Sequence, residues 1–147
     1  MKVMLVRVLK GDVLVGNEVV SSIKKGLAVF TCIEKDDDSE TLKAMVERII
    51  AARVFEDQDG KLNLSIKETG DQILCIPNFT LCADTKAGNR PSFDKAMRGD
   101  FAKPLFEQFV AILKTTAIIV ETGVFGVYMK VRLEFDGPVN IMLDSRL

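Results

Sequence analysis

Apolar residues in the first third of the chain come in short runs separated by turn residues, a pattern typical of β-strands. Residues 3–8 are apolar on nearly both faces of such a strand. Residues 10–12 (Lys-Gly-Asp) indicate a turn, and residues 16–17 (Gly-Asn) are a two-residue hairpin signal. Residues 27–33 form a continuous apolar run, which predicts a central strand covered on both faces.

Helical spacing replaces this pattern in two segments. Leucine, methionine, valine and isoleucine recur three and four residues apart between residues 42 and 50, which predicts a helix ending near residue 52. Residues 36–39 (Asp-Asp-Asp-Ser) supply its N-cap signal. Residues 100–114 have a second apolar helical face, and we expect Pro104 in the first turn of that helix.

The remaining apolar runs read as strands. A buried strand of residues 73–76 is expected to stop at Pro77, because proline has no N–H for the ladder. Residues 83–97 predict a loop, and residues 136–138 (Asp-Gly-Pro) are expected to separate the last two strands. Further strands are expected at residues 118–120, 127–135 and 139–143. The whole pattern predicts one α+β domain, residues 1–147, with two main helices and a mostly antiparallel, strongly curved sheet or partial β-barrel.

The amino-acid composition supports this fold class, and the net charge limits the classes of binding partner. Apolar residues make up 48% and charged residues 28% of the 147 residues, which is globular composition. The net charge of −1 predicts no strong attraction to bulk nucleic acid or to a membrane, so a polyanionic partner requires a local basic patch. No signal peptide and no run of about 18 apolar residues is present. We therefore expect a soluble, cytoplasmic protein.

Histidine is absent, and this restricts the chemistry. Ser-His-Asp triads, Cys-His pairs and histidine-ligated zinc are excluded. The cysteines are three in number and lack C-x-x-C spacing, which argues against a disulfide scaffold and fits a reducing compartment. Cys75 reads as inert core, whereas Cys82 lies near a candidate site but has no adjacent positive charge to activate it. No metal or cofactor is predicted.

Two segments suggest main-chain chemistry. Pro77 interrupts a strand just before Asn78, Phe79 and Thr80, which can free two backbone N–H groups beside a hydroxyl to receive an oxyanion. A plain strand end is the alternative. The dipeptide of residues 137–138 (Gly-Pro) has the composition of a cis peptide that approaches a ligand closely, or of an ordinary turn.

Two more segments suggest binding. Residues 85–98 hold four basic side chains and one acidic one, which suits phosphate contacts but also suits a solvated loop. Residues 121–129 contain two glycines that flank Phe125, which suggests a bulge or a close backbone approach.

In this order, these motifs resemble the D-aminoacyl-tRNA deacylase family along essentially the full chain. The matching positions are Arg7 and Val8, Gly26 and Leu27, residues 53–57, residues 63–65, residues 79–81, residues 83–85, Gly88, residues 90–93, residues 121–123, Phe125 and Gly126, Met129, residues 137–139 and residues 143–145.

The resemblance implies a homodimer that hydrolyses the ester between a D-amino acid, or glycine, and the 3′-terminal adenosine of tRNA. It implies a cis Gly-Pro peptide that reaches into the partner's site and excludes L side chains. It also implies that backbone N–H groups act near the ester, that no side-chain base is essential, and that the ribose 2′-OH helps activate water. Motifs and resemblance together assign catalysis to Asn78, Phe79 and Thr80, substrate binding to Arg7, Phe125, Gly126, Met129, Gly137, Pro138 and Val139, and tRNA binding to Lys86 and Arg90. Aminoacyl-tRNA is the expected partner, with no DNA and no membrane.

The chain departs from the family pattern at three places. Pro77 and Asn78 stand where the family has Ser-Gln, Asn140 replaces a threonine, and residues 31–32 (Thr-Cys) replace Leu-Gly. Two alternatives therefore stay open. One is a related deacylase whose specificity has shifted toward a small L-amino acid on the wrong tRNA. The other is a tRNA-binding homologue without catalysis.

Overall fold

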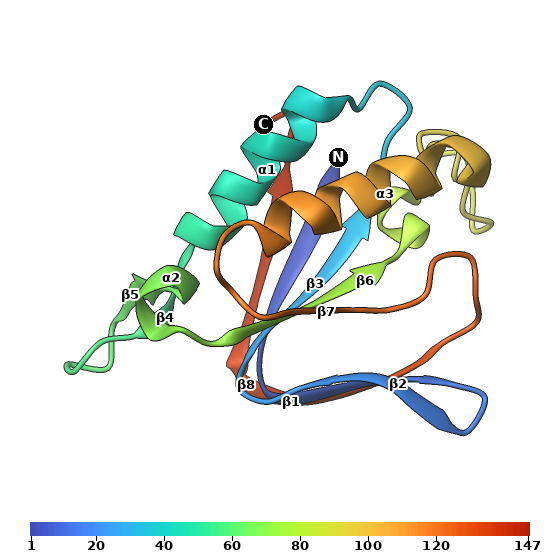
Figure 1. The fold of residues 1–147 in the computed structure, drawn as a ribbon. Helices are drawn as coiled ribbons and strands as arrows, with labels where there is room; N and C mark the ends of the chain where they lie inside the picture. The colour runs from blue at the N-terminus through green and yellow to red at the C-terminus, as the bar shows by residue number, and fades with distance from the viewer.

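The computed structural model describes residues 1–147 as an α+β fold (Figure 1). Its strands are β1 Lys2–Val15, β2 Glu18–Ile23, β3 Gly26–Cys32, β4 Arg53–Glu56, β5 Leu62–Ser65, β6 Gln72–Pro77, β7 Val120–Thr122 and β8 Lys130–Asp144. Its helices are α1 Ser39–Ala51, α2 Ile66–Thr69 and α3 Gly99–Lys114, with a 3-10 turn, η1, at Phe79–Cys82. The two long helices are those that the apolar periodicity predicts. The sequence pattern missed α2 and η1, because a single turn has no periodicity to detect.

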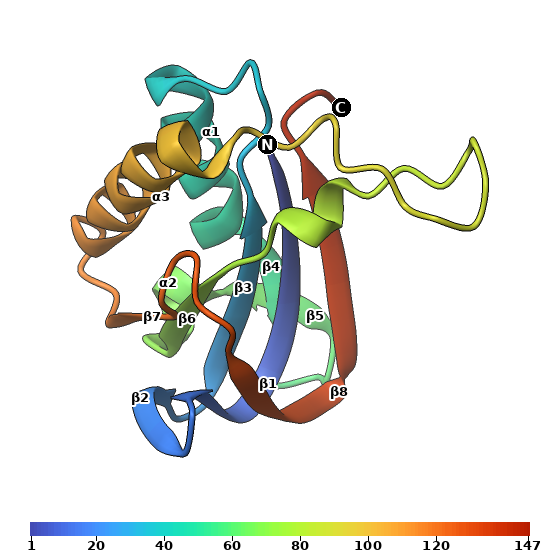
Figure 2. The same ribbon diagram turned by 90° about the vertical axis from the view of Figure 1, so that its right-hand side faces the viewer.

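Strand β1 organises the main sheet, which is mixed and curls into a nearly closed barrel (Figures 1 and 2). The strand order is β2-β1-β3-β6-β7, and β8 pairs with the other edge of β1. β1 is antiparallel to β2, β3 and β8, whereas β3–β6 and β6–β7 are parallel pairs. A separate hairpin, β4–β5, extends from the body beside α2 (Figure 1). The carboxyl ends of β3 and β6 therefore lie side by side.

The sheet has apolar side chains on both faces, so two cores form. Helices α1 and α3 cover one face and bury the larger core, which includes Leu27, Phe55 and Phe109 (Figure 1). The inside of the curl holds a smaller core of Val6, Val8, Val13, Ile23, Ala28, Leu74 and Ile76. The doubly apolar pattern of residues 3–8 is thereby explained. Asp38 caps α1 by accepting the backbone N–H of Thr41 at 2.9 Å.

Three local predictions were wrong. Lys10–Asp12 is not a turn, because β1 continues through Gly11. A Cβ there would lie 3.0 Å from Leu133 Cδ2, so a larger residue would require the Leu133 side chain to shift. Residues 136–138 do not end a strand but form a bulge within β8, where Val6 pairs with Asn140 while Val8 pairs with Phe135. Pro104 lies beyond the first turn of α3, which begins at Gly99.

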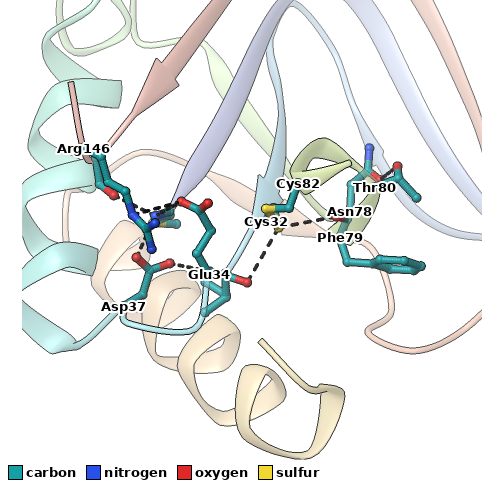
Figure 3. The surroundings of a disulfide bond; sticks show 11 residues. Cys32, Glu34, Asp37, Asn78, Phe79, Thr80, Cys82 and Arg146 are labelled. Atoms are coloured by element: carbon teal, nitrogen blue, oxygen red, sulfur yellow. Dashed lines mark hydrogen bonds and ion pairs between the residues drawn. A yellow bond between two sulfur atoms is a disulfide. The ribbon is translucent and has the colours of Figure 1, made fainter. Parts of the chain in front are cut away.

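The amino terminus is buried in a charged cluster that joins the two ends of the chain. The Met1 ammonium donates to Glu34 Oε2 at 2.9 Å, to Asp37 Oδ1 at 2.6 Å and to Ser145 Oγ at 2.6 Å. The side chains of Met1, Glu34 and Asp37 are at most 3% exposed. Figure 3 shows Glu34 and Asp37 beside Arg146, which adds a partly exposed contact to Glu34 at 3.7 Å. The cluster fixes β1 against the loop that precedes α1.

None of the helices combines the length and the apolar character that crossing a membrane requires.

Removal of one charge from this cluster tests its contribution. We expect Asp37→Ala to lower the free energy of unfolding by about 3 kcal/mol, because it leaves a buried ammonium short of a partner. Equilibrium urea unfolding measures the change. Asp36→Ala is the matched control, since Asp36 is the adjacent residue and its side chain is 88% exposed. A loss at Asp36 as large as that at Asp37 would contradict the assignment.

Candidate functional site

The site begins where β6 ends. Pro77 is the last residue that pairs with β3, opposite Thr31, and the chain then tightens into η1. The N–H of Asn78 donates to the Thr31 carbonyl at 2.8 Å and closes the ladder. The next two N–H groups, of Phe79 and Thr80, open the 3-10 turn and pair with no acceptor in the chain. The end of β6 therefore leaves two adjacent backbone donors free.

A hydroxyl lies beside these donors. Thr80 Oγ1 donates to Asn78 Oδ1 at 2.5 Å, so each of these two side chains orients the other (Figure 3). Thr80 is exposed, and so is Phe79, which is 59% accessible. The Phe79 ring points away from the disulfide in Figure 3 and meets the Phe93 ring edge-on, with centroids 5.1 Å apart. The turn thus presents donors, a hydroxyl and an apolar wall together.

A cavity of about 740 Å³ opens next to this turn. Five of the predicted site residues line it: Asn78, Phe79, Phe125, Gly126 and Met129. The sequence reasoning missed Phe93 and Tyr128, which also line it. Tyr128 is 87% exposed. An exposed aromatic ring beside a cavity indicates a binding role, but the exposure of a ring cannot be read from the sequence alone. The volume and the mainly apolar lining are those of a small-molecule site.

The glycine segment of residues 123–129 shapes one wall of the cavity. A Cβ at Gly123 would lie 2.8 Å from Met129 Sδ, so the absence of a side chain there gives Met129 its place. The N–H of Val124 donates to the same sulfur at 3.2 Å. Gly126 has a φ of +74°, a conformation that favours glycine. A close approach to the backbone is therefore found at Gly123, whereas Gly126 has no atom within 4 Å of an added Cβ.

A second group of predicted residues surrounds Arg7. Arg7 is 4% exposed, and its Nε donates to the Asp136 carbonyl at 3.1 Å while Nη1 donates to the Val54 carbonyl at 3.0 Å. Its charge is balanced by Glu56 at 3.2 Å and by the Asp136 carboxylate at 3.2 Å. One guanidinium therefore fastens the β8 bulge to β1 and β4.

The bulge carries the Gly137-Pro138 peptide, which is cis. Gly137 has a φ of +132°, and a Cβ there would lie 2.8 Å from the Val139 nitrogen, so no other residue fits without a shift. Gly137 and Pro138 are exposed, whereas Val139 is partly buried against the larger core. None of Arg7, Gly137, Pro138 and Val139 lines the 740 Å³ cavity. Within one chain, the predicted site is thus divided into two groups.

Lys86 and Arg90 lie on the loop that projects from the body (Figure 2). Asp84 shapes the base of this loop by accepting the N–H of Lys86 at 3.0 Å and by pairing with Lys95 at 3.3 Å. The Lys86 hydrogen bond, followed by the Lys95 contact, lowers the pKa of Asp84. Arg98 is occupied by Asp100 at 3.0 Å. Lys86 and Arg90 form no ion pair, so their charges face solvent.

A disulfide joins Cys32, the last residue of β3, to Cys82, the last residue of η1 (Figure 3). The Cα atoms are 6.5 Å apart although 50 residues separate the two cysteines in sequence. The expectation of no disulfide was therefore wrong. That expectation rested on the spacing of the cysteines along the chain. The parallel alignment of β3 with β6 is what brings Cys32 and Cys82 together. Cys75 is the remaining free cysteine, and burial raises its pKa to about 12, so its thiol is inert as predicted.

No group of three or more cysteine, aspartate or glutamate side chains is arranged to hold a metal ion. The groups that this geometry brings together are backbone donors, a hydroxyl and an apolar cavity.

Comparisons with known proteins identify the family of the chain. The family profile described as D-Tyr-tRNA(Tyr) deacylase matches residues 4–144. A D-aminoacyl-tRNA deacylase from Clostridium perfringens (strain 13 / Type A) is 47% identical over 146 residues, covering 99% of this chain and 98% of that protein. One from Thermotoga petrophila is 42% identical over 145 residues, covering 99% and 97%.

Solved structures resemble the fold closely. The structure described as c-Myc DNA unwinding element binding protein superposes with a TM-score of 0.93 at 37% identity, covering 98% of each chain. A probable eukaryotic D-amino acid tRNA deacylase superposes with a TM-score of 0.83 at 21% identity, covering 97% of each chain, and shows the fold alone. The family profile and the near full-length relatives establish that this chain belongs to the D-aminoacyl-tRNA deacylase family.

Proposed function

We propose that this protein hydrolyses the ester bond of D-aminoacyl-tRNA, and that of glycyl-tRNA, in a chiral proofreading step that returns free tRNA to translation in the cytoplasm. One observation carries the proposal. The free N–H groups of Phe79 and Thr80 belong to a turn beside an apolar cavity, in a chain that has no histidine. Ester hydrolysis needs oxyanion donors at the carbonyl and does not need an imidazole when the substrate supplies a proton-transfer group.

The reaction follows from these groups. Water attacks the ester carbonyl, and the carbonyl oxygen becomes an oxyanion that the N–H groups of Phe79 and Thr80 stabilise. The tetrahedral intermediate then breaks its bond to the ribose 3′ oxygen, which takes a proton as it leaves, and the amino acid is released. This proton is the one that the attacking water gives up, and the neighbouring ribose 2′-OH relays it to the 3′ oxygen. One well-placed donor lowers the activation barrier by about 3 kcal/mol, which suits an already activated ester.

Asn78 and Thr80 orient the substrate rather than act as bases. The Thr80 hydroxyl proton is engaged by Asn78 Oδ1, so its oxygen lone pairs remain available to accept from the water or the ribose. Phe125, Gly126 and Met129 line the cavity and bind the terminal adenosine or the amino acid. This arrangement places binding and charge stabilisation in one hollow.

The chiral filter comes from a second copy of the chain. Gly137 and Pro138 are exposed and do not reach the cavity of their own subunit, so a homodimer is needed to bring their carbonyls to a substrate. A fixed carbonyl beside the Cα of the substrate leaves room for a hydrogen atom there but clashes with an L side chain. This clash costs a few kcal/mol. Buried Arg7 keeps the bulge rigid enough for this discrimination.

Strand β8 supports such a dimer. Its outer edge pairs with no strand of the chain, although it is 15 residues long. Phe135, Ile141 and Met142 are exposed on it, with accessibilities of 51%, 38% and 54%. A long edge strand that carries apolar side chains is prone to pairing with another chain. The Gly137-Pro138 bulge lies between Phe135 and Ile141 and would thus lie in the interface.

The tRNA backbone is bound by the projecting loop. Lys86 and Arg90 have free charges there, and the chain as a whole is nearly neutral, so phosphate contacts concentrate on this loop.

A panel of charged tRNAs tests the function. We expect rapid release of D-tyrosine and of glycine from tRNA, with L-tyrosine released no faster than without enzyme, because an L side chain meets the filter. Release of radiolabelled amino acid measures each rate. Preferential cleavage of a small L-amino acid would instead favour the shifted-specificity alternative. Salt-sensitive tRNA binding without any cleavage would favour the alternative of a tRNA-binding homologue without catalysis.

Substitution of the hydroxyl tests the turn. We expect Thr80→Val to lower kcat about ten- to a hundredfold, because it removes a hydrogen-bonding group from the reacting centre while keeping its shape. Single-turnover deacylation measures the effect. Thr115→Val, on the last turn of the distant helix α3, also removes an exposed hydroxyl and leaves kcat unchanged. Equal rates for Thr80→Val and the parent protein would remove Thr80 from the site.

Substitution of the glycine tests the filter. We expect Gly137→Ala to lower kcat/KM for D-Tyr-tRNA at least about a hundredfold, while the free energy of unfolding falls by only about 1–3 kcal/mol. The new methyl group would collide with Val139 and shift the bulge. Gly16→Ala is the control, because Gly16 also has a positive φ, +60°, but has no atom within 4 Å of its added Cβ. Similar activity losses in both variants would indicate a general effect of strain.

A further inference from the structure

The Cys32–Cys82 disulfide attaches the catalytic turn to the sheet (Figure 3). Cys82 closes the same four-residue turn, Phe79–Cys82, that presents the two backbone donors and the Thr80 hydroxyl. Cys32 is the last residue of β3, next to Thr31, which anchors Asn78. The bond therefore lies between the rigid sheet and the residues that must be held in place for catalysis.

Other restraints on the turn are mainly local. The hydrogen bonds of Leu81 to Asn78 at 3.3 Å and of Ala83 to Thr80 at 3.1 Å begin and end within the turn or beside it. The Thr80 hydroxyl likewise reaches only to Asn78. At the amino-terminal end, the N–H of Asn78 is bound to β3. At the carboxyl-terminal end, the disulfide is the one bond that joins the turn to the sheet.

The disulfide is reachable although both cysteines are 1% exposed. Cys32 belongs to the lining of the 740 Å³ cavity, so a small thiol can approach it through the opening that the substrate uses. The sulfur also lies 3.5 Å from the Phe79 carbonyl. In the disulfide this sulfur has no proton and the distance is only a contact, but in the reduced protein the Cys32 thiol can donate a weak hydrogen bond there.

We propose that this disulfide is a reversible redox switch that positions the catalytic turn, and this inference rests on the proposed function. In a reducing compartment, disulfides are in most cases transient or redox-sensing rather than structural. Reduction cleaves the S–S bond, and a dithiol supplies two electrons and two protons to give the Cys32 and Cys82 thiols while it becomes a disulfide itself. Oxidised glutathione reverses the reaction by taking the two electrons and two protons and leaving as two glutathione thiols.

The oxidised form holds the N–H groups of Phe79 and Thr80 in the geometry described above. The reduced form keeps the fold but loosens the carboxyl-terminal end of the turn, so the donors spend less time aligned with the oxyanion. Misalignment of this kind lowers kcat rather than raising KM, because most of the residues that line the substrate cavity lie outside the turn and the disulfide. Proofreading thus becomes faster as the compartment becomes more oxidising.

The test compares the two redox forms of the intact protein. One sample is treated with oxidised glutathione and the other with dithiothreitol, and thiols are counted with a chromogenic disulfide reagent in denaturant. We expect one thiol after oxidation and three after reduction. We also expect kcat for D-Tyr-tRNA to fall about ten- to a hundredfold on reduction, with KM unchanged and with recovery on reoxidation.

Three variants separate the switch from general effects. Cys32→Ser and Cys82→Ser should both have the kcat of the reduced protein and should not respond to either reagent. Cys75→Ala is the matched control, because its buried thiol has a pKa of about 12 and takes no part in the bond, so this variant keeps the full response. Circular dichroism and thermal unfolding, followed at each redox state, verify that the fold persists at the assay temperature.

The outcomes are distinguishable. Equal kcat in both redox forms, or three thiols after oxidation, would overturn the switch and leave the deacylase function standing. Absence of deacylation in both forms would overturn the proposed function instead. In that case hydrogen exchange still decides the positioning effect. Without substrate, reduction must speed exchange at Leu81 and Ala83, whose N–H groups are hydrogen-bonded in the turn, and unchanged exchange would refute the effect.

Discussion

The parallel ladder between β3 and β6 is the constraint on which the site depends. It aligns Thr31 with Pro77, so the residues that follow, Cys32 and Asn78, emerge together at the same edge of the sheet. Pro77 has no N–H, so the pairing of β6 with the β7 side, where Ile73 donates to the Ile119 carbonyl, cannot continue at this residue. The released chain must turn at once, and the tightness of that turn is what leaves two N–H groups without intramolecular acceptors. Strand β6 ends at Pro77, whereas β3 continues one residue further, to Cys32. The positions of the donors, the hydroxyl and the disulfide all follow from this arrangement of the two strand ends.

Strand β1 relates this turn to the Gly137-Pro138 bulge. One edge of β1 pairs with β3, which supports the turn, and the other edge pairs with β8, which carries the bulge. Arg7 lies at the middle of β1 and holds the bulge through its guanidinium. The two halves of the proposed site are therefore fixed relative to one another but on different sides of a strand. A rigid separation of this kind explains why a second subunit suits the chemistry better than a mobile loop.

The sequence predicted those features of the fold that depend on a few neighbouring residues. The period of α1 and α3, the cap at Asp38 and the strand end at Pro77 each follow from a few neighbouring residues. It missed features that depend on packing between distant segments. Gly11 resembles a turn residue locally, yet it lies in a strand because Leu133 needs the space. The Cys32–Cys82 bond depends on the register of two strands, which residue spacing along the chain does not encode.

The absence of histidine connects the chemistry with its control. No side chain of this protein has an ordinary pKa between pH 5 and 8, the range in which imidazole titrates. The shifted groups near the site move away from that range, since the pKa of Asp84 is lowered by its hydrogen bond from Lys86 and that of Cys75 is raised to about 12 by burial. A site built from backbone dipoles is therefore insensitive to small changes of pH around neutrality. Its geometry is what remains adjustable, and a reversible covalent bond at the end of the catalytic turn adjusts geometry directly.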